Sequence, residues 1–285
     1  MTSVTFWTHT VWFILLGITT LIELVIIFTK VTNRKAVFAF YLTLCGLAFS
    51  FEMIILSVLK AYQYYPMIIP SSPPDDSIAG NLFSQASIPA TALLIAVLNL
   101  RYYWYFIFAI AYVVIEELFL VLGVYEQNWY QSWMTLLLTM LFFWITKHAY
   151  RLCFRRLKGF MFYLFIFLGL VALHQNLTVW GLRLSGVQLF SDSLLADKQH
   201  SLVVLSSSYM LLLGVIFMLL YFVGIHWGWK LTVIVLLYIG HGVAMMFDLI
   251  IYKEGWFWIS TSISIWSMYL FTFLLDQFYA SRTRG

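Results

Sequence analysis

Residues 102–123 read YYWYFIFAIAYVVIEELFLVLG, an apolar run interrupted only by the adjacent acids Glu116 and Glu117. One helix needs about 20 predominantly apolar residues to cross the hydrocarbon core of a bilayer. This run is long enough, and Arg101 directly precedes it. It therefore predicts a transmembrane helix that carries two carboxyl groups inside the membrane.

The rest of the chain repeats this pattern. Of its 285 residues, 63% are hydrophobic and only 10% are charged, whereas soluble domains carry about 25% charged residues. Nine apolar stretches lie near residues 6–29, 36–59, 78–99, 102–123, 131–147, 159–180, 201–223, 231–251 and 256–276. The sequence predicts an all-α fold, a polytopic bundle of about nine transmembrane helices that forms a single integral membrane domain over residues 1–285.

The basic residues predict an orientation. With the N-terminus outside, twelve of the 16 Lys and Arg residues lie on the cytoplasmic side, Arg282 and Arg284 among them. Cytoplasmic loops of membrane proteins carry such an excess. The first apolar stretch lacks a basic region and a cleavage site, so we expect it to be retained as a helix. The protein is predicted to be a multi-pass cell-membrane protein with its N-terminus outside and its C-terminus in the cytoplasm.

The loop lengths repeat along the chain. After the first helix, helices two to five and helices six to nine are joined in turn by a long outer loop, a tight inner turn and a short outer loop. Glu52 then aligns with Gln175, and Glu117 with Asp248. An even number of crossings makes such halves parallel repeats; the alternative is that short loops are simply the default in bundles. The predicted four-plus-four halves are residues 36–158 and 159–285.

Eight polar side chains are candidates for a site inside the membrane. They are Glu52, Gln85, Glu116, Glu117, His174, Gln175, His241 and Asp248. At about 1.5 Å per residue, the acids Glu52, Glu117 and Asp248 lie about 7–12 Å from the polar residues that end their helices. A charged side chain that faces lipid at mid-bilayer costs about 2.5–3.5 kcal/mol. We therefore expect the acids to converge on an outward-facing polar cavity.

Two interpretations of this polar layer remain. In the first, the acids bind a cation or titrate, and His174 and His241 carry protons. In the second, the side chains form a buried network that joins helices, at about 0.6 kcal/mol per contact. We favour the second for the serines of helix nine and the first for the acids, because a carboxyl is costly to bury.

Other polar and aromatic residues have simpler interpretations. Glu23 is expected to pair with Lys30 or Lys35, and the tyrosines near helix ends, such as Tyr62 and Tyr130, are expected to anchor the membrane interface.

Several classes of function lack their motifs. The chain has no HExxH, GxSxG or phosphate-binding Gly-rich loop, so a metalloprotease, a serine hydrolase and a nucleotide-driven pump have no support. Cys45 and Cys153 both fall toward the cytoplasmic side, where neither a disulfide nor a cysteine-ligated metal is expected. The basic residues border helix ends, where they meet anionic headgroups rather than nucleic acid. We expect no cofactor, no metal and no nucleic-acid partner.

One part of the chain resembles a known family. The segment IEELFLVLGVY at residues 115–125, followed by Asn128, Trp129 and Tyr130, is similar to uncharacterised multi-pass membrane proteins of Bacillus-type spore-forming bacteria. Further likeness lies at Phe51-Glu52, Tyr64-Tyr65-Pro66 and Ser84-Gln85, so the resemblance covers about residues 50–150. It implies a bacterial plasma membrane and supplies no activity.

The function that the sequence favours is binding or translocation of a small solute, a cation or a proton, with the lipid bilayer as surroundings, rather than catalysis. A lipid-modifying enzyme or sensor at the outer leaflet would use the acids and His174 for acid–base chemistry on a headgroup. A structural membrane partner protein would need none of these acids.

Overall fold

The computed structural model describes residues 5–69, 73–191 and 198–281. Within these ranges it has nine α-helices, and eight helices are long and apolar enough to cross a membrane. The chain is thus an all-α multi-pass membrane protein, which confirms the predicted fold class. The ninth helix, α6 (Ser132–Arg156), is the one that carries Lys147 and Arg151 within its length. Arg282 and Arg284 lie outside the described residues.

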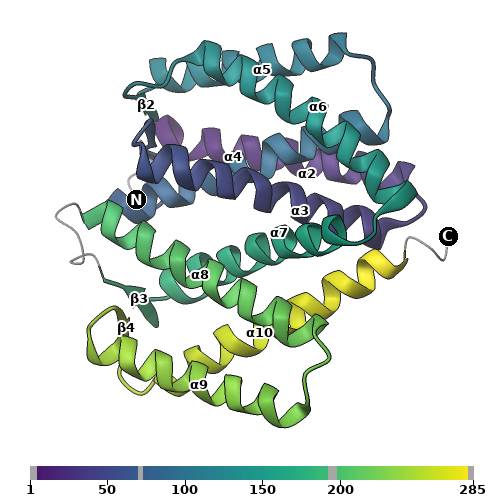
Figure 1. Cartoon of the computed structure of the whole chain (residues 1–285). Helices are drawn as coiled ribbons and strands as arrows, with labels where there is room; N and C mark the ends of the chain where they lie inside the picture. Colours follow the sequence, from purple (N-terminus) through teal and green to yellow (C-terminus); the bar gives the residue numbers. More distant parts are fainter. Residues whose placement is uncertain (1–4, 70–72, 192–197, 282–285) are drawn as a thin grey trace. The chain divides into compact units, whose positions relative to one another are not determined.

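The chain divides into two compact units, Met1–Leu157 and Lys158–Arg284 (Figure 1). The first unit contains η1 (Phe6–Thr10), α2 (Val11–Lys30), α3 (Arg34–Glu52), η2 (Met53–Val58), β1 (Tyr62–Tyr64), α4 (Pro73–Val97), α5 (Tyr103–Val121), β2 (Tyr125–Gln127) and α6. The second unit contains α7 (Phe160–Asn176), η3 (Leu177–Arg183), β3 (Gln188–Phe190), α8 (Lys198–Phe222), α9 (Trp227–Met246), β4 (Ile250–Tyr252) and α10 (Phe257–Ala280). The η segments are π-helical turns that extend α2, α3 and α7.

The described elements follow one order twice. From α3 and again from α7, the chain forms a helix, a π-helical segment, a strand, two helices, a strand and a helix. β1 pairs antiparallel with β2, and β3 pairs antiparallel with β4. α2, with η1, precedes the first copy. This is the four-plus-four layout expected from the loop lengths.

The turn before each strand has the same geometry. The residue two positions before each strand has a positive φ: Lys60 (48°), Gly123 (69°), Gly186 (71°) and Asp248 (53°). The next backbone N–H then donates to a carbonyl in the preceding helix, as from Val124 to Phe119 at 3.0 Å. Such left-handed residues end helices, and glycine adopts them most easily. The chain therefore passes from helix to strand in the same way four times.

Hydrogen bonds beside the strands also correspond between the units. The N–H of Tyr65 donates to the carbonyl of Val124 at 2.9 Å, and the N–H of Ser191 donates to that of Leu249 at 3.0 Å. Positions in the two units can therefore be matched residue by residue. Asp248 corresponds to Gly123, and not to Glu117 as the sequence comparison predicted, because both end a helix two residues before a strand.

In the first unit, α4 is the central helix. It packs against α2, α3 and α6, and α5 packs on α6. Near the strands, an apolar cluster joins Phe13 of α2 and Phe119 of α5 to the tyrosines of β1 and β2. Gly80 of α4 makes this contact close, since an added Cβ would lie 2.8 Å from the Cβ of Tyr64. The fold thus holds both strands against the ends of α2, α4 and α5.

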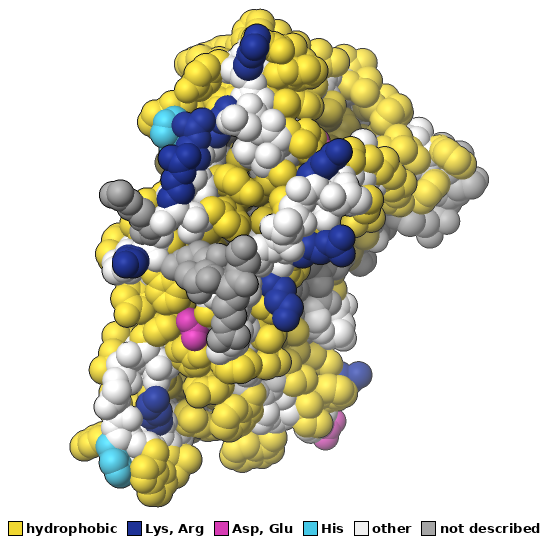
Figure 2. Space-filling model, turned by 90° about the vertical axis from the view of Figure 1, so that its right-hand side faces the viewer, with side chains coloured by type: hydrophobic (Ala, Val, Ile, Leu, Met, Phe, Trp, Pro, Cys, Tyr) yellow, Lys and Arg dark blue, Asp and Glu magenta, His cyan; other side chains and the backbone are white. Residues whose placement is uncertain are grey.

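The opposite helix ends are basic. In the first unit, α2 ends at Lys30, α3 begins at Arg34, and α6 carries Lys147 and Arg151. Figure 2 shows one face of the protein, on which Lys and Arg side chains gather among hydrophobic ones. Few Asp and Glu side chains are visible on this face.

Candidate functional site

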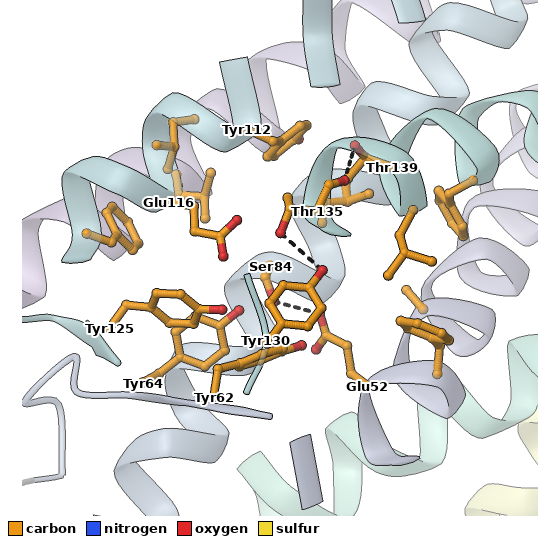
Figure 3. A pocket seen from close by; sticks show the side chains of 18 of the residues that line it. Glu52, Tyr62, Tyr64, Ser84, Tyr112, Glu116, Tyr125, Tyr130, Thr135 and Thr139 are labelled. Atoms are coloured by element: carbon orange, nitrogen blue, oxygen red, sulfur yellow. Dashed lines mark hydrogen bonds between the residues drawn. The ribbon is translucent and has the colours of Figure 1, made fainter. Parts of the chain in front are cut away.

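A cavity of about 260 Å³ lies inside the first unit, among α3, α4, α5 and α6 (Figure 3). Residues of α2, β1 and β2 complete its wall, most of which is apolar. Its polar lining consists of Glu52, Tyr62, Tyr64, Ser84, Tyr112, Glu116, Tyr125, Tyr130, Thr135 and Thr139. Pockets for drug-sized ligands measure about 300–1,000 Å³. This cavity therefore suits a smaller molecule.

Two carboxyl groups point into the cavity (Figure 3). Glu52, the last residue of α3, is 7% exposed, and its Oε1 accepts a hydrogen bond from Ser84 at 3.0 Å. On α5, Oε1 of Glu116 accepts from Nε2 of Gln127 at 2.7 Å. The Oε2 atoms of both acids are buried and make no hydrogen bond, although Asn81 and Gln85 lie near the Glu52 carboxyl, and Tyr125 and Thr135 near that of Glu116. Buried polar atoms in proteins are nearly always hydrogen-bonded, so these two oxygens remain for a ligand or for water.

Four tyrosines close the end of the cavity next to the strands. Tyr62 and Tyr64 are two residues apart in β1, so both rings lie on one face of the strand, and Tyr125 of β2 pairs with Tyr64. The ring of Tyr130 lies 5.1 Å from that of Tyr62, centre to centre. Burial, together with the charges of Glu116 and Glu52, raises the pKa of Tyr130 to about 12. The rings are therefore neutral phenols that present π faces and hydroxyl groups.

The cavity lining is buried at the strand end and exposed between two of the helices. At the strand end Tyr62, Tyr125 and Tyr130 are buried. Between α3 and α6, in contrast, the lining side chains of Phe51 and Leu141 are 42% and 51% exposed. α3 and α6 barely touch there. The cavity therefore reaches the surface sideways, between α3 and α6, and the strand pair covers its polar end.

The other two candidates in this unit lie outside the cavity wall. Gln85 is buried on α4 beside Ser84. Glu117 is exposed, and its Oε1 accepts a hydrogen bond from Ser132. Successive helical residues are turned by about 100°, so only one of the adjacent acids can face inward. That residue is Glu116.

The remaining candidates belong to the second unit. His174 is fully buried on α7, and neither ring nitrogen has a partner; Gln175 is buried beside it. His241 of α9 shares its Nδ1 with the carbonyl of Leu237 at 2.7 Å and its Nε2 with the hydroxyl of Tyr209 at 2.9 Å. Tyr209 is also bonded to Ser264 of α10. This network joins α8, α9 and α10, which is the helix-joining role favoured for the serines.

Asp248 lies outside this network. It follows the end of α9, in the left-handed turn before β4, and its side chain is exposed. The sequence predicted that Asp248 lies within the helix, on the same face as His241. The helix ends at Met246 because the turn that starts the strand requires a left-handed residue at position 248.

The tyrosines are the site residues that sequence reasoning missed. Tyr62 and Tyr130, which are buried, and Tyr64, which is half-buried, were interpreted as interface anchors, although all three line the cavity. The available signal was the alternation of Tyr62 and Tyr64, which is typical of a strand with one buried face. A strand of three residues is too short for that pattern to be decisive.

The arrangement combines two carboxyl groups, four aromatic rings and an apolar wall, which are the features that recognise an organic cation. Within the described ranges, no group of three or more His, Cys, Asp and Glu side chains is placed to hold a metal ion. Comparisons of the chain with protein-family models, with curated proteins and with solved structures found no match.

Proposed function

We propose that the protein binds a small organic cation with an apolar body in the cavity of the first unit and carries it across the membrane. The observation that supports this most is the pair of buried carboxyls, Glu52 and Glu116, each with one unpartnered oxygen facing the same tyrosine-lined space. Buried carboxylates without a countercharge are costly. A bound ammonium group supplies that charge.

The rest of the wall fits the other parts of such a ligand. Tyrosine faces attract an ammonium group by about 0.5–2 kcal/mol, more when the site is desolvated. Apolar side chains such as Phe51, Leu138 and Phe142 line the space away from the acids and would receive the hydrocarbon part.

Binding of benzyltrimethylammonium tests this function, because this cation carries a permanent charge and an aromatic body. The protein is placed in lipid nanodiscs, and binding is measured by calorimetry for the wild type, Glu52→Gln and Glu116→Gln. We expect each substitution to weaken binding at least tenfold, which corresponds to about 1.4 kcal/mol. Glu117→Gln is the matched control, since Glu117 is exposed beside the site, and it should bind as the wild type does. Wild-type affinity in both inward variants would refute the function.

The sideways opening supports a second candidate, a sensor of lipids with an ammonium headgroup at the outer leaflet. The exposed lining residues Phe51 and Leu141 lie on α3 and α6, and α3 is long and apolar enough to cross a membrane. Nanodiscs of phosphatidylcholine and of phosphatidylglycerol separate the two candidates. Both are measured at about 1 M salt, which screens the negative surface of phosphatidylglycerol. If headgroups occupy the site, phosphatidylcholine will compete and weaken the binding of benzyltrimethylammonium; a site for free cations will show equal affinity in both.

We further propose that the N-terminus lies outside and the C-terminus in the cytoplasm of a bacterial plasma membrane. The basic helix ends support the orientation, and the family resemblance supports the membrane. The two ends of α9 test it, because Gly224 and Glu254 are exposed and flank this helix. In a chain with Cys45 and Cys153 replaced by Ala, a membrane-impermeant maleimide should label Glu254→Cys on intact cells and Gly224→Cys only after permeabilisation. The reverse pattern would invert the topology.

A further inference from the structure

Glu23 is a further acid of the first unit that lies outside the cavity wall. Glu23 is half-buried on α2, and the hydroxyl of Thr91 on α4 donates to its Oε1 at 2.7 Å and to its Oε2 at 2.9 Å. The sequence predicted that Glu23 pairs with Lys30, at the end of α2, or with Lys35, at the start of α3. In the structure its hydrogen-bond donor is a threonine that is 2% exposed.

Hydroxyl groups connect Glu23 to the cavity. Because Thr91 donates its proton to Glu23, its oxygen accepts from the hydroxyl of Tyr112, at 2.7 Å. Tyr112 is in turn 2.9 Å from the hydroxyl of Ser87. Tyr112 lines the cavity, and it lies one helical turn from Glu116 on the same face of α5 (Figure 3). A row of hydrogen-bonding groups thus runs from the cation site to Glu23.

The hydrogen-bonding groups between the cavity and Glu23 lie at successive depths along the helices. Ser84, which contacts Glu52, and Thr91 are seven residues apart on one face of α4, or about 10 Å along the helix. Glu23 lies about 10 Å before the end of α2 at Lys30, by the same rise per residue. The groups thus lead from the end near the strands toward the basic end of the unit.

We infer that Tyr112, Thr91 and Glu23 form a proton path that couples cation binding in the cavity to proton release on the cytoplasmic side; this inference rests on the proposed function. Each hydroxyl can accept one proton while it donates another. When a cation enters, the proton of Glu116 passes to Tyr112 through water in the cavity, that of Tyr112 to Thr91, and that of Thr91 to Glu23. Every O–H bond that breaks is replaced by one that forms, so one proton moves from Glu116 to Glu23.

Among the polar neighbours of Glu23, Thr91 and Tyr112 are the ones placed to pass a proton to it. Tyr41 of α3 and Tyr112 of α5 are within electrostatic reach of Glu23, and Cys45 lies beside Tyr41. Tyr41 donates its own proton to the carbonyl of Ala86 at 3.0 Å, so it is directed elsewhere. Lys30, on the same helix, is exposed at its end.

Proton movement per cation tests the inference. Proteoliposomes with the pH dye pyranine inside receive labelled benzyltrimethylammonium outside, and cation uptake and internal pH are followed in the same vesicles. In wild-type protein whose predicted cytoplasmic face lies inside the vesicle, we expect uptake to lower the internal pH, because the proton is released on that face. Glu23→Gln keeps an acceptor for Thr91, so it should bind the cation as the wild type does, while the protons exchanged per cation fall about tenfold or more. Thr91→Val should show the same loss of proton exchange as Glu23→Gln. Melting temperatures check that both variants are folded.

Thr20→Val is the matched control. Thr20 is buried on α2 outside the cavity wall, and its hydroxyl donates to the carbonyl of Leu16 in its own helix at 2.8 Å. Its proton-to-cation ratio should equal that of the wild type. A wild type that does not bind the cation overturns the proposed function. A cation that binds and moves with an unchanged ratio in Glu23→Gln and Thr91→Val, or without any proton exchange in the wild type, overturns the proton path alone.

Discussion

Glu116 and His241 occupy the same position in the two units, each nine residues before the first residue of the strand that follows its helix. Neighbouring positions correspond as well, since Thr139 and Ser264 are each the eighth residue of their helix, α6 and α10. In the first unit Glu116 and Thr139 line a cavity, whereas in the second His241 and Ser264 both bond to Tyr209.

Helix packing accounts for this difference. α3 and α6 barely touch, while the equivalent α7 and α10 pack closely along their length. A wide separation leaves room for a ligand, and a close one lets polar side chains satisfy each other. Equivalent positions in the two units thus carry polar side chains, which line a cavity in the first unit and join helices in the second.

The left-handed turns predict opposite effects of two substitutions. Gly123→Ala forces a Cβ into a positive φ and should destabilise the protein by about 1 kcal/mol, whereas Asp248→Gly should stabilise it by up to about 1 kcal/mol. Gly240→Ala is the control, because Gly240 lies within α9 and has open space around its Cβ. Melting temperatures in detergent measure all three. A stable Gly123→Ala variant would contradict the turn geometry.

A larger side chain inside the cavity should prevent cation binding without destabilising the protein. Ala48 lines the cavity, so Ala48→Phe has room for its ring and should change the free energy of unfolding by less than about 1.5 kcal/mol while it blocks the ligand. Ala39→Phe, on the same helix but fully buried in packing, should destabilise by about 1–3 kcal/mol. Thermal unfolding and cation binding distinguish the two variants. Equal destabilisation by both would mean that the space beside Ala48 is not open.

The polar network of the second unit predicts that two substitutions of buried side chains differ in their effect on the free energy of unfolding. Tyr209→Phe leaves His241 and Ser264 without their shared partner and should cost about 1–3 kcal/mol. His174→Leu removes a buried imidazole whose nitrogens have no protein partner, so it should be neutral or stabilising. Cation binding in the first unit should survive both changes. If His174→Leu proves as costly as Tyr209→Phe, an ordered water must pair with His174.

Much of this fold is predictable from the sequence, for a physical reason. Lipid tolerates only long apolar helices, so runs such as 102–123 fix where α5 and its counterparts lie. The ends are less certain: α4 begins at Pro73, well before the predicted residue 78, because proline is accepted in a first helical turn. The three-residue strands and the π-helical turns leave no periodic signal of their own.

The site is predictable only in part. Glu52 and Glu116 were identified because a carboxyl in an apolar run is conspicuous. The sequence prediction chose Glu117 as the inward-facing acid of α5, whereas the structure has Glu116 there, since which of them faces inward depends on how α5 packs on α6. Asp248 was misplaced because a helix end in an apolar run depends on a single turn residue. The aromatic wall arises from strand pairing between segments far apart in the chain.

The location of the bound cation tests the central claim most directly. A structure of the protein with 4-iodobenzyltrimethylammonium, determined by electron cryomicroscopy in nanodiscs, would show the ligand itself. We expect its ammonium group between the carboxyls of Glu52 and Glu116 and within about 6 Å of a tyrosine ring centre, as cation–π contacts require. The iodophenyl group should point toward Phe51 and Leu141, between α3 and α6. A cavity left without ligand at saturating cation, or a cation bound elsewhere, would contradict the account.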